Sequence, residues 1–235
     1  MRFTADTLPV MWKKLAGAIL YILLFPVLLF LLAGDGEWKE GWVFAIWFLL
    51  LCYTTIAYLY RRDPALLAER FRKPGTGSQP PRDRLVVYLL VAGFTAWIAV
   101  MPLDARRFAW SPPFPGWLTA LGVAGLAVSF FFFFRSYADN PFLSPLVRVQ
   151  DERGQTVVST GVYALVRHPM YLAAVLMFLA APLLLGSVLG FCCGILLSLL
   201  LAARIGIEED LLARELAGYA EYCRKVRYRL VPLLW

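Results

Sequence analysis

The chain has 235 residues, of which 60% are hydrophobic and only 17% are charged. Soluble domains are typically about 45–50% apolar and about 25% charged, so this chain carries more apolar surface than a soluble domain of its length can bury. The composition therefore excludes an ordinary soluble domain and favours an integral membrane protein. The net charge of +7 would suit nucleic-acid binding only if the basic residues formed one face of a soluble domain.

Four uncharged runs, each 19 residues long, occupy the first 135 residues. They are Leu15–Ala33, Trp42–Tyr60, Leu85–Leu103 and Gly116–Phe134. A helix rises about 1.5 Å per residue, so each run spans roughly 30 Å, the thickness of a bilayer core. The runs predict four transmembrane helices. The first is interpreted as a retained span, because it is longer than the apolar part of a signal peptide.

The loop that follows the fourth run contains a predicted β-hairpin. Val147–Gln150 and Thr156–Ser159 are rich in β-branched residues and flank a turn at Asp151–Gly154. Two such segments around a short polar turn are typical of paired strands.

A fifth uncharged stretch, Met170–Ala203, has 34 residues. That is about 51 Å of helix, too long for one crossing. Leu185-Gly186-Ser187 near its middle offers a turn, so the sequence predicts a helical hairpin with spans over about 170–185 and 188–204. The expected fold is an all-α polytopic membrane protein of about six transmembrane helices. The last two form this hairpin, and an amphipathic C-terminal helix follows.

The basic residues gather on one side of this predicted topology. With six spans, 20 of the 23 Lys and Arg residues share the face that holds both termini, and only Lys39, Arg106 and Arg107 lie on the other. The positive-inside rule then places both termini and the C-terminal helix in the cytoplasm, at the inner membrane if the source is bacterial. Five spans would export the basic tail. The topology accounts for the net charge, so no nucleic-acid partner is expected.

A metal site is not expected from the sequence. The four cysteines, Cys52, Cys192, Cys193 and Cys223, lack Cys-x-x-Cys spacing, and His168 is the sole histidine. A zinc cluster or a multi-histidine site requires such groups together.

Two polar clusters flank the predicted hairpin. Arg167 to Tyr171 precedes its first helix, and Arg204 to Glu209 ends its second. A hairpin returns the chain to the same membrane face, so the clusters are expected to meet. Pro169 suits the first helical position, beyond which free N–H groups can bind a carboxylate or phosphate. Each residue alone also fits a plainer role, such as interfacial anchoring, and the convergence of the clusters is what favours a site.

The clusters belong to a longer pattern between residues 140 and 235. It consists of Gly161-Val-Tyr-Ala-Leu-Val-Arg-His-Pro-Met-Tyr171, Arg204-x3-Glu208-Glu209-x2-Leu212, Gly218-Tyr219-x2-Tyr222 and Val231-Pro232. This pattern resembles the isoprenylcysteine carboxyl methyltransferase family and the wider superfamily of integral membrane methyltransferases that includes the phospholipid methyltransferases. On this basis we divide the chain into a four-span membrane region, residues 1–135, and a methyltransferase-like catalytic region, residues 136–235.

The resemblance implies S-adenosyl-L-methionine in a cytoplasm-facing pocket and a lipophilic or small methyl acceptor that arrives from the bilayer. By position, the implied cofactor contacts are Gln150, Gln155, Thr156, Val157, Val158, Tyr163, His168, Pro169, Met170, Tyr171 and Glu208. Arg204 corresponds to the family's substrate-contacting arginine, and Arg204 and Glu208 are the expected catalytic residues. A carboxylate acceptor is favoured. A phospholipid amine or a thiol is the alternative, and it would need a base such as His168 or Glu209.

Two further function classes stay open at this point. Related C-terminal signatures occur in membrane sterol reductases, which suggests an NADPH-dependent enzyme as an alternative. A transporter would be expected to carry ionisable groups inside its spans, and the five apolar runs contain none, which argues against an ion pathway.

Overall fold

The computed structural model describes residues 8–72, 79–232 and 234–235, and these residues form helices joined by loops. The α-helices are α1 (Leu8–Ala33), α2 (Lys39–Arg62), α3 (Pro64–Glu69), α4 (Pro81–Pro102), α5 (Gly116–Asp139), α6 (Pro169–Leu185), α7 (Val188–Glu215) and α8 (Tyr219–Lys225). A π-helical turn, η1 (Leu103–Arg107), extends α4, and two 3₁₀ turns, η2 (Asp151–Arg153) and η3 (Gly161–Ala164), lie in the loop before α6. The predicted all-α fold is confirmed.

Five helical segments are long and apolar enough to cross a membrane. They are Leu15–Ala33, Lys39–Arg62, Pro81–Arg107, Gly116–Asp139 and Val188–Glu215. The remaining apolar helix, α6, has 17 residues, or roughly 26 Å, slightly less than a bilayer core. The predicted count of six spans is therefore not confirmed. The predicted hairpin is present, because α6 and α7 are joined directly at Gly186 and Ser187.

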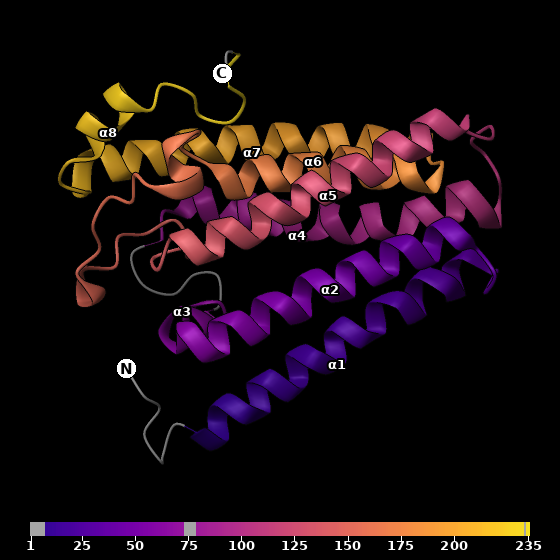
Figure 1. Ribbon diagram of the computed structural model, residues 1–235, viewed down its shortest axis with the longest axis horizontal. Coiled ribbons are helices and arrows are strands. Elements are labelled where there is room, and N and C mark those ends of the chain that lie inside the picture. Colours follow the sequence, from indigo (N-terminus) through magenta and orange to yellow (C-terminus); the bar gives the residue numbers. More distant parts are fainter. Residues whose placement is uncertain (1–7, 73–78, 233) are drawn as a thin grey trace.

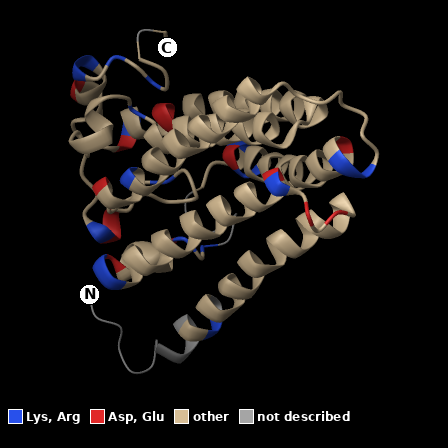
Figure 2. Ribbon diagram, turned by 45° about the vertical axis from the view of Figure 1, so that its right-hand side comes forward, with Lys and Arg blue, Asp and Glu red and all other residues tan. Residues whose placement is uncertain are grey.

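The long helices lie side by side with their axes in one general direction (Figure 1). The chain direction alternates, so that α7 ends on the side of the molecule where α1 begins and where α8 lies (Figure 1). Charged residues are found mainly near the ends of these helices, and the middles are uncharged (Figure 2). The protein is accordingly a multi-pass membrane protein.

A buried carboxylate at the end of α4 holds the hairpin turn. Gly186 has φ +80°, a left-handed conformation that glycine adopts without steric cost. Ser187 then caps α7 by accepting a hydrogen bond from the N–H of Gly190 (2.9 Å). Asp104, which is fully buried, accepts hydrogen bonds from the Ser187 hydroxyl (2.6 Å) and from the Leu189 N–H (3.1 Å). The turn is thus joined to η1 as well as to its own two helices.

Glycines bring α6 into backbone contact with both of its neighbours. A Cβ on Gly122 of α5 would lie 2.8 Å from the carbonyl oxygen of Ala180, and one on Gly194 of α7 would lie 2.9 Å from the carbonyl carbon of Phe178. Side chains larger than hydrogen would force these helices apart. The close packing sets the first turn of α6 beside the last turns of α7, where the polar clusters lie.

The prediction of a β-hairpin around Asp151–Gly154 is wrong. Within the described part of the chain no strand forms, and the turn is the 3₁₀ turn η2. Side chains take the backbone N–H groups that a ladder would use: the Val147 N–H donates to Asp83 (3.3 Å) and the Gln150 N–H donates to Oε1 of Gln155 (2.8 Å). Such side-chain bonds compete with regular pairing.

Candidate functional site

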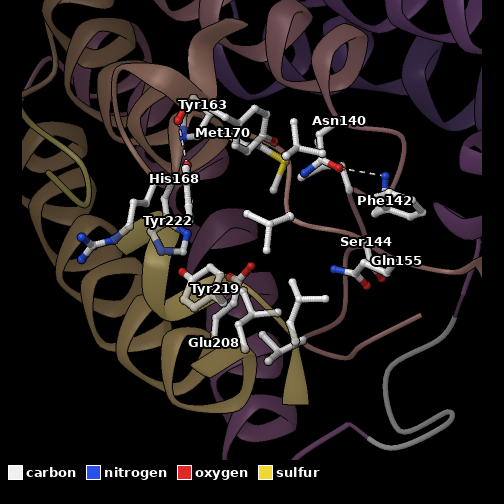
Figure 3. A pocket seen from close by; sticks show the side chains of 18 of the residues that line it. Asn140, Phe142, Ser144, Gln155, Tyr163, His168, Met170, Glu208, Tyr219 and Tyr222 are labelled. Atoms are coloured by element: carbon white, nitrogen blue, oxygen red, sulfur yellow. Dashed lines mark hydrogen bonds between the residues drawn. The ribbon is translucent and has the colours of Figure 1, made fainter. Parts of the chain in front are cut away.

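A cavity lies where the start of α6, the end of α7, α8 and the loop before α6 meet (Figure 3). It holds about 790 Å³ of empty space, its open mouth included. Its wall is formed by Asn140, Phe142, Leu143, Ser144, Leu146, Val147, Arg148, Gln155, Thr156, Val157, Val158, Tyr163, Arg167, His168, Pro169, Met170, Tyr171, Glu208, Leu212, Leu216, Tyr219 and Tyr222.

Ten of the eleven expected cofactor contacts line this cavity. They are Gln155, Thr156, Val157, Val158, Tyr163, His168, Pro169, Met170, Tyr171 and Glu208. They come from three stretches of the chain that only the fold brings together. In the view of Figure 3, Glu208 and Tyr219 lie across the cavity from Gln155 and Ser144. That these residues bind a cofactor stays a prediction.

Gln150, the eleventh, lies behind the cavity wall. Its side chain is fully buried. It donates to the carbonyl oxygen of Phe142 (2.5 Å) and accepts from Arg153 (2.8 Å). Both polar ends of the amide are therefore engaged with the protein, and Gln150 shapes the loop that carries the lining residue Gln155.

Arg204, the expected substrate contact, is also outside the cavity lining. Its Nε lies 2.7 Å from Oδ1 of Asp83, and its NH2 group donates to the carbonyl oxygen of Pro145 (2.7 Å). The guanidinium carbon is 5.8 Å from the centre of the Tyr171 ring. Arg204 therefore supports the back of Tyr171. Asp83, fully buried at the start of α4, was missed in the sequence because it sits between Arg82 and Arg84 in what resembles an interfacial charge cluster.

Glu208 is the charged group that the cavity leaves without a counter-ion. Its Oε2 accepts a hydrogen bond from the Tyr171 hydroxyl (2.6 Å). Among the described residues no cation lies within ion-pair distance of Glu208, whereas Arg148 and Arg167, which also line the cavity, both pair with carboxylates. A cationic group of a ligand would therefore meet an uncompensated carboxylate.

The neighbouring Glu209 has a different environment. It accepts from Nε of Arg167 (2.6 Å), from Nε of Arg229 (2.8 Å) and contacts Nε2 of His168 (3.1 Å). Successive residues on a helix point about 100° apart, so Glu209 faces this cationic cluster while Glu208 faces the cavity. Burial lowers the pKa of Arg167, but the hydrogen bond to Glu209 and the nearby Glu209 charge together outweigh burial, so that the pKa of Arg167 is raised. Glu209 joins the start of α6 to the C-terminal segment and does not line the cavity.

Tyrosines form much of the remaining wall. The Tyr222 hydroxyl donates to the carbonyl oxygen of Tyr163 (2.7 Å). Burial raises the pKa values of Tyr219 and Tyr222, so both phenols stay protonated at neutral pH. The Tyr219 side chain is buried, and its hydroxyl makes no hydrogen bond to the described residues. A buried hydroxyl without a partner costs free energy, which a ligand atom could recover.

The first turn of α6 presents backbone donors to the same space. Pro169 is the first helical residue, and His168 provides no side-chain cap. The first N–H groups of a helix have no partner within the helix. Those of Met170 and Tyr171, both lining residues, therefore form a site where a carboxylate can bind.

Ion pairs fasten the loop wall to α3. Arg148 pairs with the buried Glu69 (3.0 Å) and with Glu152 (2.7 Å). The hydrogen bond from Arg148 lowers the pKa of Glu152 to about 2. Glu69 of α3 and Asp83 of α4 therefore hold two parts of the cavity wall, because Glu69 binds Arg148 and Asp83 accepts the N–H of Val147. Among the described residues no group of His, Cys, Asp or Glu side chains is arranged as a metal site.

A family model and a known protein both match parts of this chain. The phospholipid methyltransferase family model matches residues 117–217, which include α6, α7 and all of α5 except its first residue. This match confirms the resemblance found in the sequence. The Delta(14)-sterol reductase TM7SF2 of Mus musculus is 26% identical over 162 residues, which are 63% of this chain and 39% of that protein. The chain thus spans about two fifths of the length of this relative.

Proposed function

We propose that the protein is an S-adenosyl-L-methionine-dependent methyltransferase that modifies a lipophilic or small acceptor at the cytoplasmic membrane boundary. The observation that carries the proposal is the cavity at the ends of the α6–α7 hairpin. Most of its wall lies within the segment that the phospholipid methyltransferase model matches. The cytoplasmic side rests on the excess of Lys and Arg at this end of the predicted topology.

The donor and acceptor groups of the cavity fit those of the proposed cofactor. Its carboxylate matches the free N–H groups of Met170 and Tyr171, and its ammonium matches the unpaired carboxylate of Glu208. The sulfonium suits tyrosine ring faces. The Tyr219 hydroxyl, which has no hydrogen-bond partner among the described residues, would gain one from the ribose or adenine.

When bound, S-adenosyl-L-methionine supplies an electrophilic methyl group for direct transfer. The residues of the chain then position the reactants and stabilise charge. Tyr171 orients Glu208 through its 2.6 Å hydrogen bond, and Arg204 supports Tyr171 from behind. An amine or thiol acceptor must lose a proton. His168 is the lining residue for that step, through Nδ1, because its Nε2 contacts Glu209 (3.1 Å) and Glu209 is itself directed at Arg167 and Arg229.

The pairing of Arg204 with Asp83 changes the choice of acceptor. A carboxylate was favoured because Arg204 was expected to contact it, but in this structure the guanidinium is already neutralised. Carboxylate, phospholipid amine and thiol acceptors are therefore proposed on equal terms. Incubating membranes that contain the protein with a methyl-labelled cofactor, followed by mass spectrometry of the labelled lipids, would distinguish them.

Titration of the purified protein with S-adenosyl-L-methionine tests the cofactor directly. A hydrogen bond or ion pair to a charged group contributes about 1.5–3 kcal/mol, so Glu208→Gln should weaken binding roughly tenfold to a hundredfold. Glu215→Gln is the matched control, since Glu215 is an exposed carboxylate on the same helix. Absence of binding to the parent protein, or equal binding by Glu208→Gln, would refute the proposal.

A nicotinamide-dependent reductase is the second candidate, because the matched relative is a sterol reductase. The phosphates of NADPH require cations, and the arginines that line the cavity are paired with carboxylates. We therefore expect S-adenosyl-L-methionine, and not NADPH, to raise the melting temperature of the protein. The opposite result would favour the reductase.

A further inference from the structure

A second hollow lies outside α5 and α6, apart from the cavity described above. Its lining comes from α5, from the loop before α6 and the first two turns of α6, and from the end of α8 with the C-terminal segment after it: Val128, Phe132, Ala164, Leu165, Val166, Leu172, Leu176, Lys225, Val226, Arg227, Tyr228 and Pro232. Leu176 lies seven residues beyond Pro169, or about 10 Å along the helix. The hollow therefore runs from the end of the helices into the apolar part of the spans.

The charges of the hollow are confined to one end and are positive. Lys225 and Arg227 are its charged lining residues, and basic residues mark this part of the chain in Figure 2. Arg227 is exposed and makes no ion pair with the described residues. Lys225 pairs with Glu221 at 2.8 Å, but both side chains are more than half exposed. Such surface pairs are weak and exchange readily with another anion.

We propose that this hollow binds a phospholipid with an anionic headgroup. Its acyl chain would lie along Val128, Leu172 and Leu176, and its phosphate would meet Lys225 and Arg227. The hollow joins an apolar floor at membrane depth to a cationic rim at the membrane boundary. This arrangement is complementary to an anionic lipid, which has apolar chains and a negatively charged headgroup. A free phosphate would leave the floor uncovered, and a zwitterionic lipid would leave the rim without net compensation.

The hollow and the cavity share a wall but take different ligands. The Arg167 side chain donates to the carbonyl oxygens of Val226 and Arg227 (3.0 Å each). The C-terminal segment that borders the hollow is therefore held by a residue that lines the cavity. Lipid binding can be measured without the cofactor, so this proposal does not depend on the proposed function.

Native mass spectrometry of the full chain in a neutral detergent tests the proposal. Phosphatidylglycerol and phosphatidylcholine with the same acyl chains are compared, with glycerol phosphate as the headgroup alone. We expect one phosphatidylglycerol to be retained in preference to phosphatidylcholine. Arg227→Gln should weaken that binding about fivefold, which is the ~1 kcal/mol of one basic residue near an anionic surface. Val128→Trp, which fills the floor at an exposed position, should abolish it.

Arg224→Gln is the matched control, because Arg224 is an exposed arginine of α8 outside the hollow lining. It should leave phosphatidylglycerol binding unchanged. Equal retention of the two lipids would overturn the proposal, as would equal losses in Arg224→Gln and Arg227→Gln, which would indicate general surface attraction. Binding of glycerol phosphate as tight as that of phosphatidylglycerol would overturn it too.

Discussion

Replacing each of the two adjacent glutamates of α7 with alanine should have sharply different effects on the stability of the fold. The Glu209 side chain is 10% exposed and joins Arg167, Arg229 and His168. Glu208 makes one hydrogen bond, to Tyr171. We predict that Glu209→Ala destabilises the fold, whereas Glu208→Ala leaves it nearly intact and impairs ligand binding.

The size of the effect follows from what each substitution leaves behind. Removing one member of a buried ion pair typically costs about 3–5 kcal/mol, because the partner charge stays buried. Arg167 is 8% exposed but keeps two carbonyl acceptors, and Arg229 is 40% exposed and adds little. We therefore expect the lower end of the range, about 3 kcal/mol, for Glu209→Ala. Loss of the single hydrogen bond in Glu208→Ala should cost about 1 kcal/mol.

Thermal unfolding in detergent, followed by circular dichroism, measures the difference. For a chain of this size 1 kcal/mol corresponds to roughly 2–4 °C, so Glu209→Ala should melt roughly 10 °C below the parent and Glu208→Ala about 3 °C below it. A Glu209→Ala protein that melts within 2 °C of the parent would refute the reasoning. So would a Glu208→Ala protein that is the less stable of the two.

The remaining predictions concern helix packing and pH. Gly194→Ala should lower the melting temperature by several degrees, because its Cβ would overlap the backbone of Phe178 and overpacking costs about 1–3 kcal/mol. Gly206→Ala, with open space at the same helix, should not lower it, and a matching drop would contradict the packing argument. Glu152→Gln should reduce stability at pH 7 by less than about 1 kcal/mol, since the carboxylate is half exposed. The pKa of Glu152 is lowered to about 2 by Arg148, so this contribution is present above the unfolded pKa and is lost as the pH falls through 2. Melting curves of parent and variant should therefore converge between pH 4.5 and 2, and a constant difference would count against the ion pair.

The helices could be predicted because each apolar run is as long as a helix must be to cross the bilayer core. Leu15–Ala33 and Gly116–Phe134 appear in α1 and α5 as expected. The hairpin could be predicted because Gly186 interrupts a stretch too long for one crossing. The number of spans does not follow from length alone, since α6, with 17 residues, is shorter than the five helices that are long enough to cross a membrane.

The loop before α6 could not be predicted from its own residues. Val147–Gln150 has the composition of a strand, but its conformation is set by side chains that come from elsewhere. Asp83 accepts the N–H of Val147 from 64 residues away, and Arg148 binds Glu69 from 79 residues away. Local propensity says nothing of such partners.

The sequence by itself determined the class of this protein and the residues that gather at its site. Uncharged runs require a membrane, and the pattern from Arg167 to Tyr171 with Glu208 places the site at the ends of a hairpin. Only the tertiary structure decided what each polar residue does there. Asp83, 121 residues from Arg204, pairs with the arginine that was expected to contact the substrate, and this arginine lies beside the Tyr171 ring. Glu208 and Glu209 are adjacent residues of the same type. On α7, however, the Glu208 side chain faces the cavity, whereas the Glu209 side chain faces Arg167, His168 and Arg229. Ion pairs between residues so far apart in the sequence depend on how the helices pack. For that reason they cannot be predicted from the sequence alone.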